Sequence, residues 1–149
     1  MKKSASLGVA VIGAGRIGTL RARLSAKHPS VGFLAIADID PARAKALADI
    51  TGADFHTGNN FEAIEHPKVT AVFVSTPEGE HAAPIKRALE LGKPVLVEKP
   101  IALALGDAED ILATLKATNG NLRVGYSRRY KECFLRAKEQ MIQGRLGRV

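Results

Sequence analysis

The sequence is poor in cysteine and has no apolar stretch long enough to cross a membrane. The single cysteine, Cys133, excludes an intrachain disulfide and a cysteine-rich metal site, and it fits a reducing compartment, so we expect a cytoplasmic protein. Because no apolar run approaches about 20 residues, we expect no membrane partner. His28, His56 and His66 have no metal-ligand spacing among them, and Cys133 has no paired histidine. We therefore predict neither a metal site nor a cysteine nucleophile.

Two patterns that would indicate other architectures or enzyme classes are also missing. The chain has no internal repeat and no low-complexity linker, and its 149 residues suit one domain with its own core. The Tyr-x-x-x-Lys pair of short-chain dehydrogenases is absent, because Tyr126 is followed four positions later by Tyr130. What remains is a single globular domain of another class.

Positive charge is distributed unevenly along the chain. The formal net charge is +7, and residues 121–149 hold eight lysines and arginines against Glu132 and Glu139, a surplus of +6. A basic segment can bind nucleic acid, but no recognised nucleic-acid motif accompanies this one. We expect a solvated helix face and no nucleic-acid partner, and salt-sensitive binding to DNA would reverse that expectation.

The most informative stretch is Leu7–Gly18, LGVAVIGAGRIG. A short apolar run ends at Gly13, and Gly15 and Gly18 complete the pattern G-x-G-x-x-G. The stretch Arg16–Lys27 reads as helical, and this order of strand, glycine turn and helix is what the dinucleotide-binding fingerprint requires. We expect Gly13 to permit the tight turn, Gly15 to let the backbone approach a pyrophosphate, and Gly18 to let helix and strand pack closely.

An acidic residue follows the second apolar stretch, Val31–Ala37. Asp38 lies 20 residues after Gly18, where a carboxylate would bind the adenosine ribose hydroxyls of NAD. The competing interpretation is that Asp38 only caps the next helix. Arg43, five residues further on, could bind the 2′-phosphate of NADP, so NADP stays open as an alternative cofactor. The sequence therefore predicts NAD as the cofactor, with NADP less favoured.

Strands and helices alternate along the chain, and several helix ends are marked. Asp40 and Pro41 suit the start of one helix, and Gly52 and Gly92 suit the ends of two others. The alternation predicts an α/β fold with a doubly wound parallel sheet of the Rossmann type. We expect strands at residues 9–12, 31–37, 53–56, 70–75, 94–97 and 122–125, and helices at residues 16–27, 42–49, 59–64, 80–91, 106–116 and 130–143.

Further motifs lie at the expected carboxyl ends of the later strands. They are S-T-P at residues 75–77, a histidine just beyond, GKPVLVEKP at residues 92–100 and VGYSRRY at residues 124–130. With the fingerprint and the acid they resemble the glucose–fructose oxidoreductase / inositol dehydrogenase / MocA family, over nearly all of the chain. The resemblance implies an amino-terminal domain that binds NAD or NADP. It also implies a carboxy-terminal α/β domain that supplies the substrate pocket, typically with an Asp and a His for acid–base chemistry.

The resemblance also implies roles for single residues. Lys99 would be the catalytic residue, beside the nicotinamide and the reacting hydroxyl, and would contact the substrate together with Arg128 and Arg129. Glu98 would orient that lysine, bind the cofactor or form a structural salt bridge. His81 is expected near the S-T-P loop, in a hydrogen bond at a helix start rather than as a general base.

The same resemblance implies a set of cofactor-binding residues. The pyrophosphate would be held by Gly13, Gly15, Arg16 and Ile17, and residues 75–77 would line the crossing between adenosine and nicotinamide. The expected cofactor-binding residues are Gly13, Gly15, Arg16, Ile17, Asp38, Ser75, Thr76, Pro77, His81, Glu98, Lys99 and Pro100.

The chain departs from the family pattern in two positions and in length. Glu78 stands where the family commonly has Asn, and Ser127 where it commonly has Asn or Met, and both affect the expected substrate more than the cofactor. Family members continue for roughly another domain of ordinary size. We expect a dinucleotide-binding domain at residues 1–125. Residues 126–149 would then be a connecting segment and helix that lead to a substrate domain absent from this chain.

The sequence therefore predicts the cofactor domain of an oxidoreductase that transfers a hydride between a sugar or polyol and a nicotinamide cofactor. A desolvated lysine can exchange a proton with a substrate hydroxyl as the hydride leaves. This chain alone would be catalytically incomplete, because groups from the second domain are missing. The alternative is a stand-alone NAD(P)-binding regulatory domain without catalysis, which tight NAD binding without turnover would favour.

The last expected helix carries an apolar stripe, formed by Tyr130, Phe134, Ala137 and Met141 at helical spacing. If this helix folds onto the edge of its own sheet, the chain is a monomer. If it does not, the stripe invites a symmetric dimer or an exchanged helix. We expect a homo-oligomer, although the surplus charge of each tail opposes association at low salt.

Overall fold

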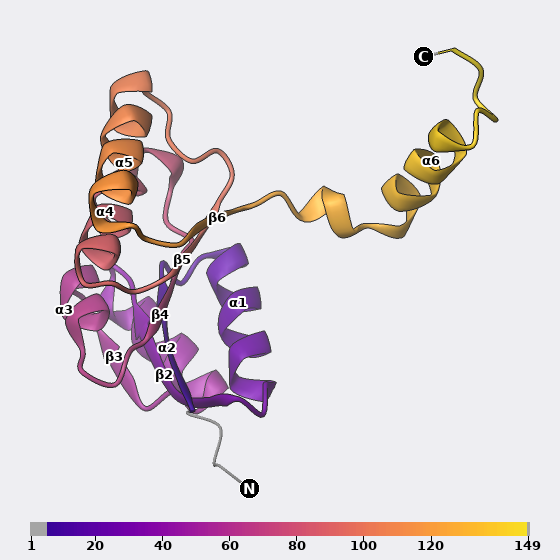
Figure 1. Ribbon diagram of the computed structural model, residues 1–149. Helices are drawn as coiled ribbons and strands as arrows, with labels where there is room; N and C mark the ends of the chain where they lie inside the picture. The colour runs from indigo at the N-terminus through magenta and orange to yellow at the C-terminus, as the bar shows by residue number, and fades with distance from the viewer. Residues whose placement is uncertain (1–5, 149) are drawn as a thin grey trace, which may run out of the picture.

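The computed structural model describes residues 6–148, and its centre is a six-stranded sheet with helices on both faces (Figure 1). All paired strands are parallel, and their order is β3-β2-β1-β4-β5-β6. The predicted doubly wound parallel sheet is therefore confirmed. The strands are β1 (Leu7–Ile12), β2 (Val31–Ala37), β3 (Phe55–Thr57), β4 (Ala71–Val74), β5 (Val95–Glu98) and β6 (Leu122–Gly125).

Several helix ends lie at residues that satisfy free backbone groups. Asp40 accepts hydrogen bonds from the amides of Ala42 and Arg43 at the start of α2, and Gly52, with φ of 67°, ends that helix. Asn119, with φ of 48°, ends α5. The helices are α1 (Arg16–Lys27), α2 (Pro41–Thr51), α3 (Asn60–Glu65), α4 (Ala82–Glu90), α5 (Leu105–Thr118) and α6 (Glu132–Ile142), with 3₁₀ turns η1 (Glu78–Glu80) and η2 (Ser127–Tyr130).

Two helix starts differ from the sequence prediction because a 3₁₀ turn precedes each helix. The helix expected from residue 80 begins at Ala82, after η1, and the helix expected from residue 130 begins at Glu132, after η2. Tyr130 therefore lies in η2 and not on the helix whose stripe it was expected to extend. Short 3₁₀ turns are common at helix starts and carry little periodic signal.

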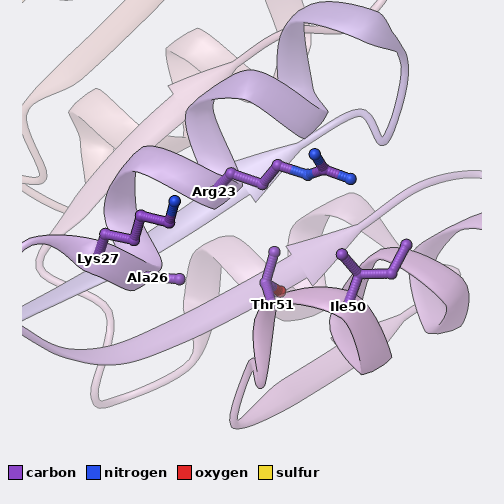
Figure 2. A pocket seen from close by; sticks show the side chains of 5 residues that line it. All are labelled: Arg23, Ala26, Lys27, Ile50 and Thr51. Atoms are coloured by element: carbon purple, nitrogen blue, oxygen red, sulfur yellow. The ribbon is translucent and has the colours of Figure 1, made fainter.

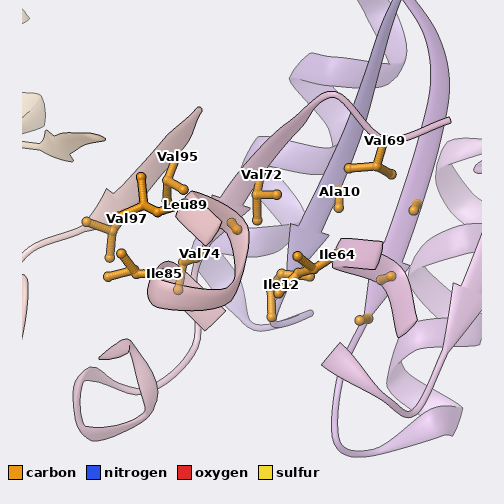
Figure 3. Packing of buried hydrophobic residues seen from close by; sticks show 14 of the residues in the cluster. Ala10, Ile12, Ile64, Val69, Val72, Val74, Ile85, Leu89, Val95 and Val97 are labelled. Carbon is orange, nitrogen blue, oxygen red and sulfur yellow. The ribbon is translucent and has the colours of Figure 1, made fainter. Parts of the chain in front are cut away.

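The sheet is covered on both faces, which explains why its central strands are continuously apolar. On one face, Ile12 and Val74 pack with Ile85 and Leu89 of α4 and with residues of α3 and α5 (Figure 3). On the other face, β1 and β2 pack against α1 and α2 through a smaller cluster that includes Val11. Each fully buried aliphatic side chain of this kind contributes about 1.5–3 kcal/mol.

The segment after β6 lies apart from this core. Figure 1 shows η2 and α6 leading away from the sheet toward the carboxyl end. No residue of α6 is buried, and Phe134 and Met141 of the predicted stripe are exposed. In this structure the helix does not fold onto the edge of its own sheet. Among residues 6–148, no helix has the length and apolarity needed to cross a membrane.

Candidate functional site

A cavity of about 590 Å³ lies at the carboxyl ends of the strands, where β1 is flanked by β2 on one side and β4 on the other. The strand order reverses at this point, and ligands of open α/β sheets bind in the crevice that such a reversal creates. Its wall contains eight of the twelve residues expected to bind a cofactor. The other four, which are His81 and the E-K-P residues Glu98, Lys99 and Pro100, do not line it. The lining residues are Gly13, Gly15, Arg16, Ile17, Asp38, Ile39, Arg43, Asn60, Ser75, Thr76, Pro77 and Glu80.

The three fingerprint glycines are glycines for different reasons. Gly13 has φ of 95°, and a Cβ there would lie 2.6 Å from the carbonyl oxygen of Ser75. A Cβ on Gly18 would overlap the carbonyl oxygen of Gly13. Gly15 has an ordinary φ of −71°, and the nearest atom to a Cβ there is a terminal nitrogen of Arg43 at 3.7 Å. Nothing in the protein requires glycine at this position, so the space before it suits a ligand that approaches the bare backbone.

The start of α1 also suits an anionic ligand. The helix begins at Arg16, directly after Gly15, and its first turn contains no acidic residue. The first amides of a helix have no partner within the helix, and the helix dipole places partial positive charge beside them. A pyrophosphate in the cavity would meet these amides without a competing carboxylate from the first turn of the helix.

Asp38 is buried, and its carboxylate ties two elements of the site together. One oxygen accepts a hydrogen bond from the amide of Ala14 at 2.7 Å, and the other accepts one from the amide of Asp40 at 3.0 Å. The cap of α2 is Asp40, so Asp38 is not the helix cap of the competing interpretation. Because a carboxylate oxygen can accept more than one hydrogen bond, both oxygens retain capacity for ribose hydroxyls.

Two polar atoms in the residues that line the cavity lack partners. Within residues 6–148, the hydroxyl of Ser75 and the side-chain oxygen of Asn60 are buried without a hydrogen bond. Buried polar atoms of folded proteins are nearly always paired, with protein, water or ligand. Together with the open backbone at Gly15, these atoms show that the residues present fit a dinucleotide.

His81 does not make the predicted hydrogen bond at a helix start. The residue stands at the start of α4, but its side chain bonds no amide of that helix. Its Nδ1 lies 2.9 Å from the carbonyl oxygen of Pro100, and its Nε2 lies 3.1 Å from that of Thr76. The side chain does lie near the S-T-P loop, as expected. Its ring nitrogens contact two loops and no group within the helix.

Glu98 forms the salt bridge that was one of its three expected roles. Arg21 of α1 donates from Nε to the Glu98 carboxylate at 2.9 Å, and both side chains are about four-fifths buried. The other carboxylate oxygen lies against Gly125, where a Cβ would approach it to 3.1 Å. Sequence reasoning missed Arg21, which is 77 residues from its partner and carries no local signal.

The structure does not bring the remaining predicted residues to the cavity. Lys99 is exposed beyond the end of β5, at the same edge of the sheet but one strand further from the reversal point. Arg128 and Arg129 lie in η2, where their guanidinium groups lie 5.9 Å from the ring centres of Phe134 and Tyr126. Neither arginine lines the cavity, and their contact with substrate stays a prediction.

A second hollow, of about 440 Å³, lies between α1 and α2. Figure 2 shows Arg23 and Lys27 on α1 beside Ile50 and Thr51 on α2. Both helices end here, and the partial negative charge of helix carboxyl ends opposes any anion that the two cations would attract. We assign this hollow no function.

Comparison with known proteins agrees with this geometry. Inositol 2-dehydrogenase of Rhizobium meliloti (strain 1021) is 36% identical over 142 residues, which are 93% of this chain and 42% of that protein. The NAD(+)-dependent scyllo-inositol 2-dehydrogenase of Bacillus subtilis (strain 168) is 31% identical over 93% of this chain and 41% of its own length. The chain thus spans about two-fifths of the length of these curated relatives.

Solved structures give the same result. Scyllo-inositol dehydrogenase from Lactobacillus casei, with bound NAD(H) and scyllo-inositol, superposes with a TM-score of 0.86 at 26% identity, over 95% of this chain and 42% of that one. The family model described as the oxidoreductase family with the NAD-binding Rossmann fold matches residues 7–126. On the fold, the cavity at the strand reversal and this match, the chain belongs to the Gfo/Idh/MocA oxidoreductase family and supplies its NAD-binding Rossmann fold.

Proposed function

We propose that this chain is the cofactor-binding part of an NAD-dependent dehydrogenase that acts on inositol or a related polyol. The observation that carries the cofactor half is the open backbone at Gly15, which faces the same cavity as the buried carboxylate of Asp38. The substrate half rests on the relatives, two of which are named inositol 2-dehydrogenase and scyllo-inositol 2-dehydrogenase.

In this proposal the bound nicotinamide cofactor supplies the hydride chemistry, and the chain's own residues bind, orient and move a proton. The amides at the start of α1 bind the pyrophosphate, and Asp38 accepts hydrogen bonds from the ribose hydroxyls. Lys99 gives a proton to the substrate oxygen, or takes one from it, at Nζ. Because Arg21 neutralises Glu98, the carboxylate next in sequence is already paired and does not compete for that ammonium.

The cofactor half predicts a preference for NADH over NADPH. The carboxylate of Asp38 would repel a 2′-phosphate in a partly desolvated site, so we expect NADH to bind at least tenfold more tightly, a difference of about 1.4 kcal/mol. Isothermal titration calorimetry with both cofactors measures this directly. Asp38→Asn should reduce the preference for NADH over NADPH, since an amide removes the repulsion of the 2′-phosphate but keeps one hydrogen-bond acceptor.

Arg43→Ala serves as the control, because this guanidinium lies beside Gly15 in the same wall. Equal or tighter binding of NADPH by the unmodified chain would overturn the preference. A loss of NADPH affinity alone in Arg43→Ala would then identify Arg43 as the phosphate partner. Addition of NAD and myo-inositol tests the need for a second domain: we expect no useful turnover by this chain alone, and robust turnover would refute that need.

A further inference from the structure

His81 is a buried polar side chain that the proposed function leaves without a role. Only 1% of its surface is exposed. Its two ring nitrogens face two backbone carbonyl oxygens that belong to different loops, one in the loop after β4 and one in the loop after β5. The first of these loops lines the cavity, and the second carries Lys99.

The position of the ring is informative because the strand ladder ends just before it. β4 and β5 are paired up to Val74 and Val97, and each strand is followed by its loop beyond these residues. The ring of His81 lies just beyond the end of this backbone pairing. Its Nε2 contacts the carbonyl oxygen of Thr76, and its Nδ1 contacts that of Pro100. A side chain that spans two loops in this way fixes their separation.

The chemistry of the contacts explains why a histidine suits the position. Carbonyl oxygens only accept hydrogen bonds, so a ring nitrogen must carry hydrogen to satisfy either of them. A neutral imidazole donates to one of the two carbonyls, and an imidazolium donates to both. A buried carbonyl that lost its donor would keep the full cost of its desolvation, which favours the loop conformation that retains the bond.

We propose that His81 is a positioning residue, which holds the cavity loop at residues 75–77 against the Lys99 loop at residues 98–100. The inference rests on the proposed function, because a cofactor is what these two loops would jointly bind. His81 itself touches no reacting atom. Its effect is to set the distance between the cofactor-binding edge and the lysine.

Three substitutions separate the two contacts. His81→Leu removes both ring nitrogens and with them both contacts. His81→Gln carries an amide near the position of Nε2 and can still donate to the carbonyl of Thr76, whereas His81→Asn carries one near Nδ1 and can still donate to that of Pro100. The matched control is Ile85→Val, a fully buried residue one turn along α4 that makes neither contact.

Two measurements on this chain test the proposal: NADH affinity by calorimetry, and amide hydrogen exchange of both loops without cofactor. We expect His81→Leu to weaken NADH binding about tenfold and to speed exchange in residues 76–80 and 98–104. His81→Gln should retain most of the affinity and free only the loop after β5. His81→Asn should lose affinity, because it frees the loop that lines the cavity.

The outcomes distinguish this inference from a structural role alone. If His81→Leu matches Ile85→Val in affinity and loop exchange at equal thermal stability, His81 only fills the core and the inference is wrong. Equal effects of the Gln and Asn variants would also overturn it, and this pair remains informative if the Leu variant does not fold. If the unmodified chain fails to bind NADH while His81→Leu still frees both loops, the proposed function is wrong, but the role of His81 in holding the two loops together is supported.

Discussion

Residues 6–125 bury the apolar faces of their helices against a sheet, whereas residues 126–148 leave almost every side chain exposed. Both regions nevertheless form regular helices. In the tail, α6 is supported by pairs along its own surface, such as Arg136 with Glu132 and Gln143 with Glu139. Helices of this length are marginal in water without tertiary contacts. Local pairs alone would therefore leave α6 only marginally stable, whereas packing against the sheet stabilises the helices of residues 6–125.

The largest expected difference between the two regions comes from one substitution made in each. Ile85→Ala, in the core on α4, should lower the free energy of unfolding by about 2–5 kcal/mol, because it leaves a cavity among packed side chains. Ile142→Ala, at the end of α6, should change it by less than about 0.5 kcal/mol, since 76% of that residue's surface is exposed. Urea denaturation followed by circular dichroism measures both.

A cost above about 1 kcal/mol for Ile142→Ala would mean that the tail is packed in solution. A second variant, Phe134→Ala in the first turn of α6, checks this interpretation at the other end of the helix. If both tail variants are costly at high protein concentration and neutral at low concentration, the packing is between chains.

The exposed tail predicts self-association, which we propose as the state of this chain in solution. Phe134, Leu135, Met141 and Ile142 leave an apolar surface that a second copy or an exchanged helix would bury. Because the tail is strongly basic, association should increase with salt as repulsion between tails is screened. Light scattering across protein and salt concentrations measures the mass of the particle.

The control is a chain that ends at Gly125, which removes the stripe and most of the surplus charge. We expect this shorter chain to be monomeric under every condition and to keep its affinity for NADH, since the cavity is lined by residues before β5. A full-length chain that stays monomeric even at high salt would refute self-association. It would place the tail helix on its own domain.

The difference between the regions also separates what the sequence could predict from what it could not. Helix starts and ends such as Asp40 and Gly52 were predicted correctly, because their signals lie within a few residues of the backbone groups they satisfy. Eight residues of the cavity wall were among the predicted cofactor-binding residues for the same reason, because they lie in motifs that directly follow strands. The contact between His81 and Pro100 spans 19 residues, and the ion pair of Arg21 and Glu98 spans 77. Such partners are chosen by the packed fold and have no local pattern.

The position of α6 was beyond prediction for a different physical reason. Its stripe specifies that an apolar partner is needed, but the same pattern suits the sheet edge, a second copy or another domain. The position of the E-K-P residues relative to the cavity could not be predicted either. Lys99 lies one strand beyond the reversal point and outside the cavity wall, so its spacing from the cofactor depends on contacts that no single motif encodes.

The smallest expected effects come from two ion pairs of equal length in the two regions. An arginine and a glutamate approach to 2.5 Å both in Arg21–Glu98 and in Arg136–Glu132, but side-chain exposure is about one-fifth in the first and 75% in the second. Glu98→Gln should lower the free energy of unfolding by about 1–3 kcal/mol, since it leaves a largely buried guanidinium with a weaker partner. Glu132→Gln should cost only about 0.3–0.5 kcal/mol, because water competes for both charges.

Denaturation at low and at high salt checks the cause: screening should abolish the small effect of Glu132→Gln and leave most of that of Glu98→Gln. Equal costs for the two variants would show that burial does not separate the regions, and that the tail is covered as well as the sheet is.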